Sequence, residues 1–346
     1  MSEKGQIFVG GLPRSGTSLM RIIIGNHPDV AMFFEDLPLW GRFYRNYKNK
    51  DFSKEKNRIE LIDDINSHFV IEMSKIKPRK EQILNALKNE SYVDCMVIFN
   101  YLLKDYAEQT SKTRFGIKVP LTEFYAEPIF EAFPNAKIIH VLRDIRDVAV
   151  SYRNAGNKKT GEGRGIRQYS LLHHIFLWKN STLQAKKLEE KYPEKFLIVR
   201  YEDVVTSSEE YIQKVCEFTD LTYIPDILEM KEQEAWTGQN SSFQTTEESR
   251  SKINTTALGR HKTMLSEPIT WVYQLFTWKI MKHFGYTPYQ YSSSVALKGC
   301  VHIIGNLPEF ISIRTMQFVA ALIRGSFLYK PTKKLYQKLN IPDYLG

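Results

Sequence analysis

A loop near the start of the chain has the composition of a phosphate-binding loop. Gly11 and Gly16 have the spacing of a P-loop, and Ser18 stands where that motif has Ser or Thr. Backbone N–H groups of such a loop, at the start of a helix, bind phosphate oxygens. Thr17 replaces the lysine that reaches the outer phosphates of ATP or GTP, and Arg14 is a cation able to substitute for it. We therefore predict a nucleotide whose transferable group is not an ordinary γ-phosphate.

A second candidate anion site follows an apolar strand in the middle of the chain. Arg143 comes directly after the predicted strand 137–142, and ligands of α/β sheets bind at the carboxyl ends of strands. Ser151 lies two turns further along the helix that we expect to follow. A guanidinium and a hydroxyl on one helix face suit a phosphate group. A strand-end salt bridge between Arg143 and Asp144 is the alternative, and the P-loop motif favours the anion site.

Alternating strands and helices must position these residues. Short apolar runs bounded by turn residues predict strands, and longer segments with helical periodicity separate them. This order predicts an α/β fold with a P-loop-like central parallel sheet flanked by helices on both faces. We also predict a helical insertion over about residues 53–110 and a helical C-terminal extension. The predicted strands are 7–10, 115–119, 137–142 and 196–200, and the later predicted helices are 144–154, 166–191, 207–219 and 267–284.

Length and charge divide the chain into two parts. With 346 residues and 42% hydrophobic content, it can form one large domain, which we place at residues 1–290. Residues 290–346 hold seven Lys or Arg and two Asp or Glu, so this segment carries +5 of the net charge of +9. We predict a basic, partly amphipathic extension over 291–346, with an apolar stretch at 311–329. A packing arm is the favoured role, and peripheral contact with a membrane surface or a homodimer contact are the alternatives.

Cysteine usage and hydropathy predict a cytoplasmic protein. Cys95, Cys216 and Cys300 lie far apart without metal-ligand spacing, so we expect reduced thiols and no metal site. The first strand begins too close to Met1 for a signal peptide, and no uncharged apolar run reaches the ~18 residues of a membrane helix. Any membrane association is therefore expected to be peripheral. No nucleic-acid-binding motif accompanies the positive charge, so nucleic acid is not an expected partner.

Three motifs together resemble the sulfotransferases that use 3′-phosphoadenosine-5′-phosphosulfate (PAPS). These motifs are the loop 13–19, the pair Arg143 and Ser151, and the run Arg200-Tyr201-Glu202-Asp203. The resemblance implies a P-loop-like α/β fold that transfers a sulfuryl group to an alcohol, phenol or amine without a metal. It also implies that the loop binds the 5′-phosphosulfate and that the Arg–Ser pair binds the 3′-phosphate.

The start of the chain is most similar to the tyrosylprotein sulfotransferases, and the resemblance covers about residues 6–288. It implies that Glu35 is the general base, that Lys118 stabilises the transition state and that Tyr201 contacts the donor. A late loop implies a cation at Arg260 and a hydroxyl at Thr246, with Ser249 and Ser251 as competitors. His140 is the alternative base. The implied catalytic residues are Glu35, Lys118 and Arg14, and the implied donor-binding residues are Arg14, Ser15, Gly16, Thr17, Ser18, Arg143, Ser151, Tyr201, Thr246 and Arg260.

The acceptor stays open at this point. Relatives that sulfate peptides have basic residues after the Glu, whereas residues 33–40 here read Phe-Phe-Glu-Asp-Leu-Pro-Leu-Trp, which is mainly apolar and aromatic. Such an entrance fits a phenol, a lipid or a sugar-bearing small molecule at least as well as a protein tyrosine. The acceptor is therefore expected to be a small molecule, a glycan, a lipid or a peptide.

Two other functions compete with this interpretation. A P-loop nucleotide kinase would need a lysine at Thr17 and an aspartate directly after an apolar strand, and Arg143 occupies that second position. A non-catalytic protein that binds PAP, the desulfated donor, would not need both Glu35 and Lys118. We therefore predict a PAPS-dependent sulfotransferase.

Overall fold

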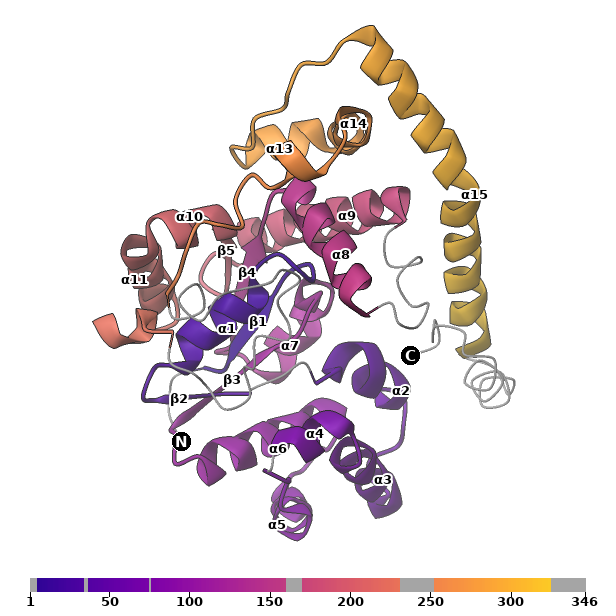
Figure 1. The fold of residues 1–346 in the computed structure, drawn as a ribbon. Coiled ribbons are helices and arrows are strands. Elements are labelled where there is room, and N and C mark those ends of the chain that lie inside the picture. The colour runs from indigo at the N-terminus through magenta and orange to yellow at the C-terminus, as the bar shows by residue number, and fades with distance from the viewer. Residues whose placement is uncertain (1–4, 34–36, 75, 160–169, 231–251, 325–346) are drawn as a thin grey trace.

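A five-stranded parallel sheet forms the centre of the protein (Figure 1). The structure is a computed structural model that describes residues 5–33, 37–74, 76–159, 170–230 and 252–324. The strand order is β2-β3-β1-β4-β5, and every neighbouring pair is parallel, so all carboxyl ends meet at one edge. The strands are β1 (Ile7–Gly10), β2 (Val30–Met32), β3 (Arg114–Lys118), β4 (Lys137–Leu142) and β5 (Phe196–Arg200). The predicted α/β class is confirmed.

Helices cover both faces of the sheet because successive strand residues point to opposite sides. On one face, Val9 and Val141 pack with α1 (Thr17–Gly25), α10 (Tyr201–Thr206) and α11 (Ser208–Phe218). On the other face, Phe8 and Ile138 pack with α6 (Cys95–Gln109), α7 (Ala126–Ala132) and α9 (Leu171–Lys191). The near-continuous burial of β1, β2, β3 and β4 is what a sheet covered on both faces requires, and the edge strand β5 is only partly buried.

A group of helices between β2 and β3 forms the lower part of the molecule in Figure 1. Its members pack around fully buried side chains such as Trp40, Leu61 and Phe99. Asp94 caps the last of them, because its carboxylate accepts hydrogen bonds from the N–H groups of Met96 and Val97, both at 2.9 Å. The helices are α2 (Arg45–Tyr47), α3 (Glu55–Asn66), α4 (Phe69–Ser74), α5 (Lys80–Ala86) and α6, with the short helical segments η1 (Leu39–Tyr44) and η2 (Leu87–Asn89). Two further short helical segments lie later in the chain, η3 (Thr122–Tyr125) and η5 (Pro225–Leu228).

The helices that follow β4 and those near the C-terminus lie above and to the right of the sheet in Figure 1. They are α8 (Ile145–Lys159), α13 (His261–Met264), α14 (Glu267–His283) and α15 (Ser293–Arg324). Helices α8, α14 and α15 contact α9, and α13 contacts α8. The helix predicted from residue 166 is observed from Leu171, and residues 160–169 lie outside the described ranges.

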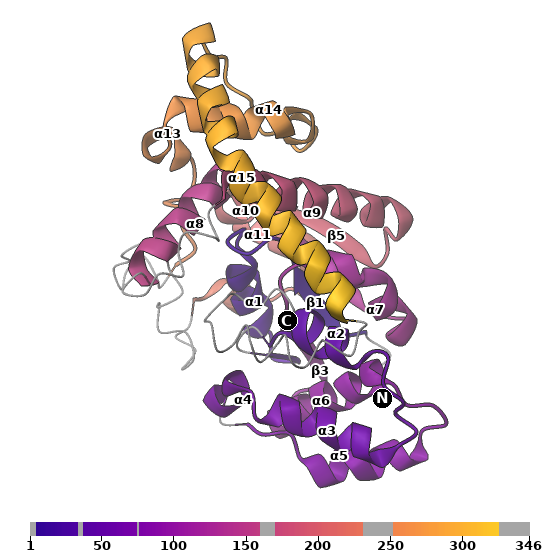
Figure 2. The ribbon, with the colours of Figure 1, turned by 90° about the vertical axis from the view of Figure 1, so that its right-hand side faces the viewer.

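The C-terminal extension contains a much longer helix than the predicted stretch 311–329. Helix α15 begins at Ser293, and Figure 2 shows it lying across α14 and α9. A Cβ at Gly299 would lie 2.2 Å from Cε3 of Trp271, so the absence of a side chain there permits close packing on α14. The sequence pattern missed this start because tertiary packing on α14 stabilises the helix.

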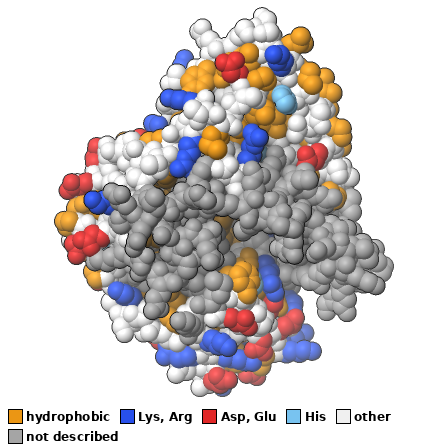
Figure 3. Space-filling model, viewed as in Figure 1, with side chains coloured by type: hydrophobic (Ala, Val, Ile, Leu, Met, Phe, Trp, Pro, Cys, Tyr) orange, Lys and Arg blue, Asp and Glu red, His pale blue; other side chains and the backbone are white. Residues whose placement is uncertain are grey.

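The outer face of α15 is apolar. Figure 3 shows apolar side chains along the rim over this helix. The exposed residues are Leu297, Val301, Ile304, Leu307 and Ile311. No helix among the described residues is long and apolar enough to cross a membrane.

Candidate active site

The predicted phosphate-binding loop joins β1 to α1 at the carboxyl edge of the sheet. Gly11, Arg14 and Gly16 adopt positive φ angles of 123°, 73° and 105°. A Cβ at Gly11 would lie 2.5 Å from the carbonyl oxygen of Val141 in β4, so only glycine allows this close approach. The hydroxyl of Ser15 donates to the carbonyl oxygen of Leu12 at 2.6 Å and closes the turn. Thr17, at the start of α1, is buried.

Tyr201 packs directly on this loop. A Cβ at Gly16 would lie 2.3 Å from Cδ2 of Tyr201, so the ring occupies the space that any side chain at position 16 would need. Tyr201 begins α10 immediately after β5, which explains how a residue so far along the chain reaches the loop. Burial raises the pKa of Tyr201, and the positive charge of Arg143 opposes that rise.

Arg143 is held at the carboxyl end of β4 by three groups from distant segments. Its Nη1 donates to the carbonyl oxygen of Arg14 at 3.3 Å, and its Nη2 donates to that of Ala257 at 2.5 Å. Its guanidinium carbon lies 4.4 Å from the centre of the Tyr201 ring, a cation–π contact. The side chain is buried, yet its Nε has no hydrogen-bond partner among the described residues. An anion is the ligand that would satisfy such a donor.

Ser151 faces the same loop from α8. Its hydroxyl oxygen accepts a hydrogen bond from Nε of Arg14 at 3.1 Å. The side chain of Arg14 therefore lies beside the Arg143–Ser151 pair. The alternative role of Arg143, a salt bridge with Asp144, is not observed, although both residues lie within the described ranges. Asp144 instead pairs with Arg146, whose Nη2 donates to its carboxylate at 2.6 Å.

Arg260 joins this cluster from the loop before α13. Its Nε donates to the carbonyl oxygen of Thr256 at 2.8 Å. Partial burial lowers the pKa of Arg260, and the positive charge of Arg143 lowers it further. Two guanidinium groups thus repel one another at this site, and a phosphate bound between them would relieve the repulsion.

Asp147 fixes the loop that carries Arg260. Its carboxylate accepts hydrogen bonds from the N–H of Gly259 at 2.7 Å and from the N–H and ring Nδ1 of His261 at 3.0 and 2.7 Å. Burial would raise the pKa of Asp147, but the hydrogen bonds from His261 and nearby positive charge bring it below its ordinary value. The sequence analysis did not single out Asp147. The signal that could have indicated it is its position one helical turn before Ser151, on the same face of α8.

Lys118 ends β3 beside the P-loop strand. It pairs in register with Val9 of β1, and its side chain is buried. The N–H of Leu121 then donates to the carbonyl oxygen of Gly11 at 3.0 Å, which ties the segment after β3 to the loop. Lys118 and the loop therefore share the carboxyl edge of the sheet.

Glu35 and Thr246 lie outside the described residues, as do the competitors Ser249 and Ser251. On the two sides of the segment 34–36, Phe33 and Leu37 are both buried. The N–H of Phe33 donates to the carbonyl oxygen of Gly116 at 2.9 Å, so the chain continues from β2 along β3 up to this point.

The alternative base His140 is enclosed in the core. Its side chain is 1% exposed, and its Nδ1 lies 3.5 Å from Oε2 of Glu123. The other oxygen of Glu123 accepts a hydrogen bond from the hydroxyl of Ser181 on α9. His140 therefore lies between the sheet and α9.

Titratable side chains do not form a metal cluster in the part of the chain that the structure describes. No group of three or more His, Cys, Asp or Glu there could hold a metal ion. The chemistry available at the described site comes from cations, hydroxyls and loop N–H groups. This set suits a polyanionic nucleotide.

Protein-tyrosine sulfotransferases are among the proteins that the chain resembles in sequence. The chain is 25% identical over 233 residues to a protein-tyrosine sulfotransferase of Drosophila melanogaster, covering 66% of this chain and 41% of that protein. It is 27% identical over 225 residues to a putative protein-tyrosine sulfotransferase of Caenorhabditis briggsae, covering 64% of this chain and 68% of that protein. The chain thus spans less than half the length of the Drosophila relative.

Two solved structures share the fold. One is a sulfotransferase domain from the curacin biosynthetic pathway, with a TM-score of 0.52 and 18% identity over 83% of this chain and 99% of that one. The other is a sulfotransferase domain from the Synechococcus PCC 7002 olefin synthase, with a TM-score of 0.53 and 17% identity over 84% of this chain and 98% of that one. A sulfotransferase family model matches residues 6–226, which is more than half of the chain, and this protein therefore belongs to the sulfotransferase family.

Proposed function

We propose that this protein transfers the sulfuryl group of PAPS to the hydroxyl group of an acceptor. The observation that carries the proposal is the cluster of Arg14, Arg143 and Arg260 at the carboxyl edge of the sheet, where Arg14 also bonds to Ser151. The carboxylate of Asp147, which acts electrostatically on Arg260, accepts hydrogen bonds from Gly259 and His261. Three guanidinium groups thus meet at one end of the sheet, and a nucleotide with phosphates at both ends of its ribose is a ligand that would suit them.

The residues divide into a group for each end of the donor. Arg143, Ser151 and Arg260 would hold the 3′-phosphate, and the unpartnered Nε of Arg143 supports this role. Ser15, Gly16, Thr17 and Ser18 would hold the 5′-phosphosulfate through backbone N–H groups and hydroxyls. Arg14 lies between the two groups because its backbone belongs to the loop and its Nε reaches Ser151. Thr246 remains a proposed donor contact of the late loop.

The reaction is an in-line displacement at sulfur. The acceptor oxygen forms a bond to sulfur as the bond between sulfur and the 5′-phosphate oxygen breaks, and the electron pair leaves with PAP. Glu35 takes the proton of the acceptor hydroxyl. Lys118, Arg14 and the loop N–H groups stabilise the charge on the sulfuryl oxygens and on the leaving phosphate. Glu35 is preferred to His140 as the base because a base must reach the acceptor, and His140 is enclosed by the core.

The acceptor is proposed to have an apolar body, such as a phenol or a lipid alcohol. Phe33 and Leu37, which flank the segment that carries Glu35, are both buried in the apolar core. Ile65, Ile71 and Leu102 from the helical insertion belong to the same buried cluster. An apolar setting of this kind favours an apolar acceptor over an acidic peptide. Tyrosine remains the second candidate because the curated relatives are named for protein-tyrosine sulfation.

Radiolabelled PAPS provides the direct test. The protein is incubated with ³⁵S-PAPS and, separately, with 2-naphthol, a long-chain alcohol, a simple sugar and an acidic tyrosine peptide, and labelled product is measured beside PAP release. Transfer to the naphthol or the alcohol supports the apolar acceptor, and transfer only to the peptide replaces it. PAP binding without transfer to any acceptor favours a non-catalytic PAP-binding protein. Phosphate transfer from ATP with Mg²⁺ would favour the kinase.

A further inference from the structure

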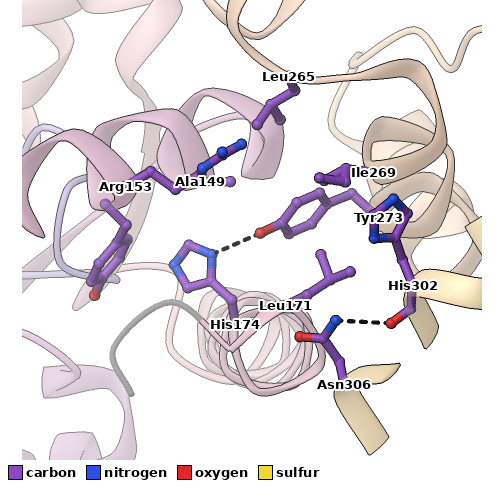
Figure 4. A pocket seen from close by; sticks show the side chains of 10 residues that line it. Ala149, Arg153, Leu171, His174, Leu265, Ile269, Tyr273, His302 and Asn306 are labelled. Atoms are coloured by element: carbon purple, nitrogen blue, oxygen red, sulfur yellow. Dashed lines mark hydrogen bonds between the residues drawn. The ribbon is translucent and has the colours of Figure 1, made fainter. Parts of the chain in front are cut away.

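A second cavity lies on the far side of α8 from the donor site. It has a volume of about 160 Å³, and its walls come from α8, α9, α15 and the segment from Leu265 through α14 (Figure 4). On α8, Ser151 faces the loop, whereas Ala149 and Arg153 line the cavity. Because each helical residue turns by about 100°, positions two apart point about 200° away from one another. The cavity and the donor site therefore use opposite faces of one helix.

Apolar side chains form one part of the cavity wall. Leu171, Leu265 and Ile269 line it together with Ala149. The volume is close to that of an engineered apolar cavity of about 150 Å³ that takes up benzene. The size therefore suits a single six-membered ring with small substituents.

His174 supplies an unsatisfied polar group in this wall. Its ring is 3% exposed, and Figure 4 shows it pointing toward the Tyr273 hydroxyl, which lies 3.4 Å from its Nδ1. Its Nε2 finds no hydrogen-bond partner in residues 5–33, 37–74, 76–159, 170–230 and 252–324. A buried polar atom of this kind costs free energy unless a ligand or a water bonds to it.

The imidazole of His174 is a neutral group. Burial, together with a smaller effect of the neighbouring His173, lowers its pKa to about 3, so the ring carries no charge near neutral pH. A neutral ring nitrogen forms hydrogen bonds with a hydroxyl or a carbonyl group. It carries no positive charge that would stabilise a bound carboxylate. The lining residue Arg153 is positively charged, but its side chain is exposed. No charge therefore comes from His174 at the buried end of the cavity, and that end favours an uncharged group of the ligand.

We propose that this cavity is a second ligand site, which binds a small uncharged ring molecule whose hydroxyl or carbonyl group bonds to His174. The apolar side chains of Leu171, Leu265 and Ile269 contact the ring. The proposal does not depend on the transfer reaction, because none of these residues belongs to the donor or acceptor machinery described above.

Titration of the full-length protein with p-cresol tests the proposal. The His174→Leu variant is expected to bind p-cresol about tenfold more weakly, because one neutral hydrogen bond is lost. The matched control is His173→Leu, which changes the neighbouring residue on α9 that does not line the cavity, and its affinity should equal that of the wild type. Toluene, which lacks the hydroxyl, should bind the wild type about tenfold more weakly than p-cresol.

A cavity-filling variant separates this site from the acceptor site. Ile269→Trp fills the cavity and should therefore abolish the binding of p-cresol there, which is the binding that His174→Leu weakens. The proposal is wrong if no p-cresol binds the wild type, or if His174→Leu and Ile269→Trp both bind p-cresol with wild-type affinity. Should either variant fail to fold, a crystal of the wild type soaked in p-cresol decides: density beside His174 supports the site, and density only elsewhere overturns it.

Discussion

Asp147 accepts hydrogen bonds from both the backbone N–H and the ring Nδ1 of His261, at 3.0 and 2.7 Å, and so fixes the residue next to Arg260. Nε2 of His261 in turn lies 2.9 Å from the hydroxyl of Tyr289. The loop that carries Arg260 is therefore tied to α8 and to the segment after α14. A carboxylate buried on one helix thus positions a cation that belongs to a loop more than a hundred residues later.

Replacing Asp147 by Asn should weaken PAP binding by about tenfold, because the charged acceptor of two backbone N–H groups becomes a neutral amide. Calorimetric titration with PAP measures the change. The control is Asp226→Asn, an exposed carboxylate in η5, which should leave the PAP affinity unchanged. A positioning role also predicts that Asp147→Asn raises the KM for PAPS more than it lowers kcat. Equal PAP affinity in wild type and Asp147→Asn would remove Asp147 from the donor site.

Replacing Arg143 by Ala should weaken PAP binding by about 100-fold or more, because a buried charge-assisted contact to phosphate is lost. Arg200→Ala is the matched control, since Arg200 also ends a strand and its guanidinium lies over a tyrosine ring, that of Tyr286, at 4.8 Å. The control should keep the wild-type PAP affinity. If the two variants lose affinity equally, Arg143 does not bind the 3′-phosphate.

Replacing Glu35 by Gln should lower kcat by about 100-fold while the Kd for PAP stays the same, because the general base is lost and the donor contacts remain. Glu210→Gln, an exposed change on α11, serves as the control. Steady-state kinetics with PAPS and the accepted substrate gives both parameters. Full turnover in Glu35→Gln together with loss of turnover in His140→Ala would make His140 the base.

Replacing Gly16 by Ala should lower the free energy of unfolding by ~2 kcal/mol and weaken PAP binding. The methyl group would lie against the Tyr201 ring, and the φ of 105° disfavours any side chain. Urea unfolding checks the stability. Gly305→Ala is the control, since no described atom lies within 4 Å of a Cβ at that position on α15. Equal stabilities of the two variants would show that Tyr201 does not pack on the loop as described.

The buried His174 predicts how stability depends on pH. Its pKa is about 3 in the folded protein and about 6.5 in the unfolded chain, so between these values only the unfolded chain takes up the proton. Stability should therefore fall as the pH drops below 6.5. The part due to His174 is ~2 kcal/mol between pH 7 and pH 5. His174→Leu should remove that part in urea unfolding at both pH values, whereas His283→Gln, an exposed change, should not.

The sequence predicted the local elements better than their packing. The bounds 137–142 and 196–200 agree with β4 and β5, because both strands are compact apolar runs between polar turns. Strand β3 is one residue earlier at each end than predicted, since its pairing with β1 and β2 decides its limits. The start of α15 at Ser293 depends on packing against α14, and no local pattern marks it.

For the candidate site too, the sequence indicated individual residues but not the contacts between them. Motifs predicted Arg14 and Arg143 as site residues from their positions after strands, and Ser151 from its position on the helix that follows. The contact of Arg14 with Ser151 joins residues 137 apart, and that of Asp147 with His261 joins residues 114 apart. Such pairs depend on how the whole sheet folds, so spacing alone could not predict them.

Thermal unfolding with added nucleotides tests the central claim most directly. A ligand that binds only the folded protein raises the unfolding midpoint by mass action. PAP should raise it strongly, whereas AMP, which lacks the 3′-phosphate, and ATP or GTP with Mg²⁺ should raise it little. A rise with ATP or GTP and none with PAP would contradict a PAPS-dependent sulfotransferase.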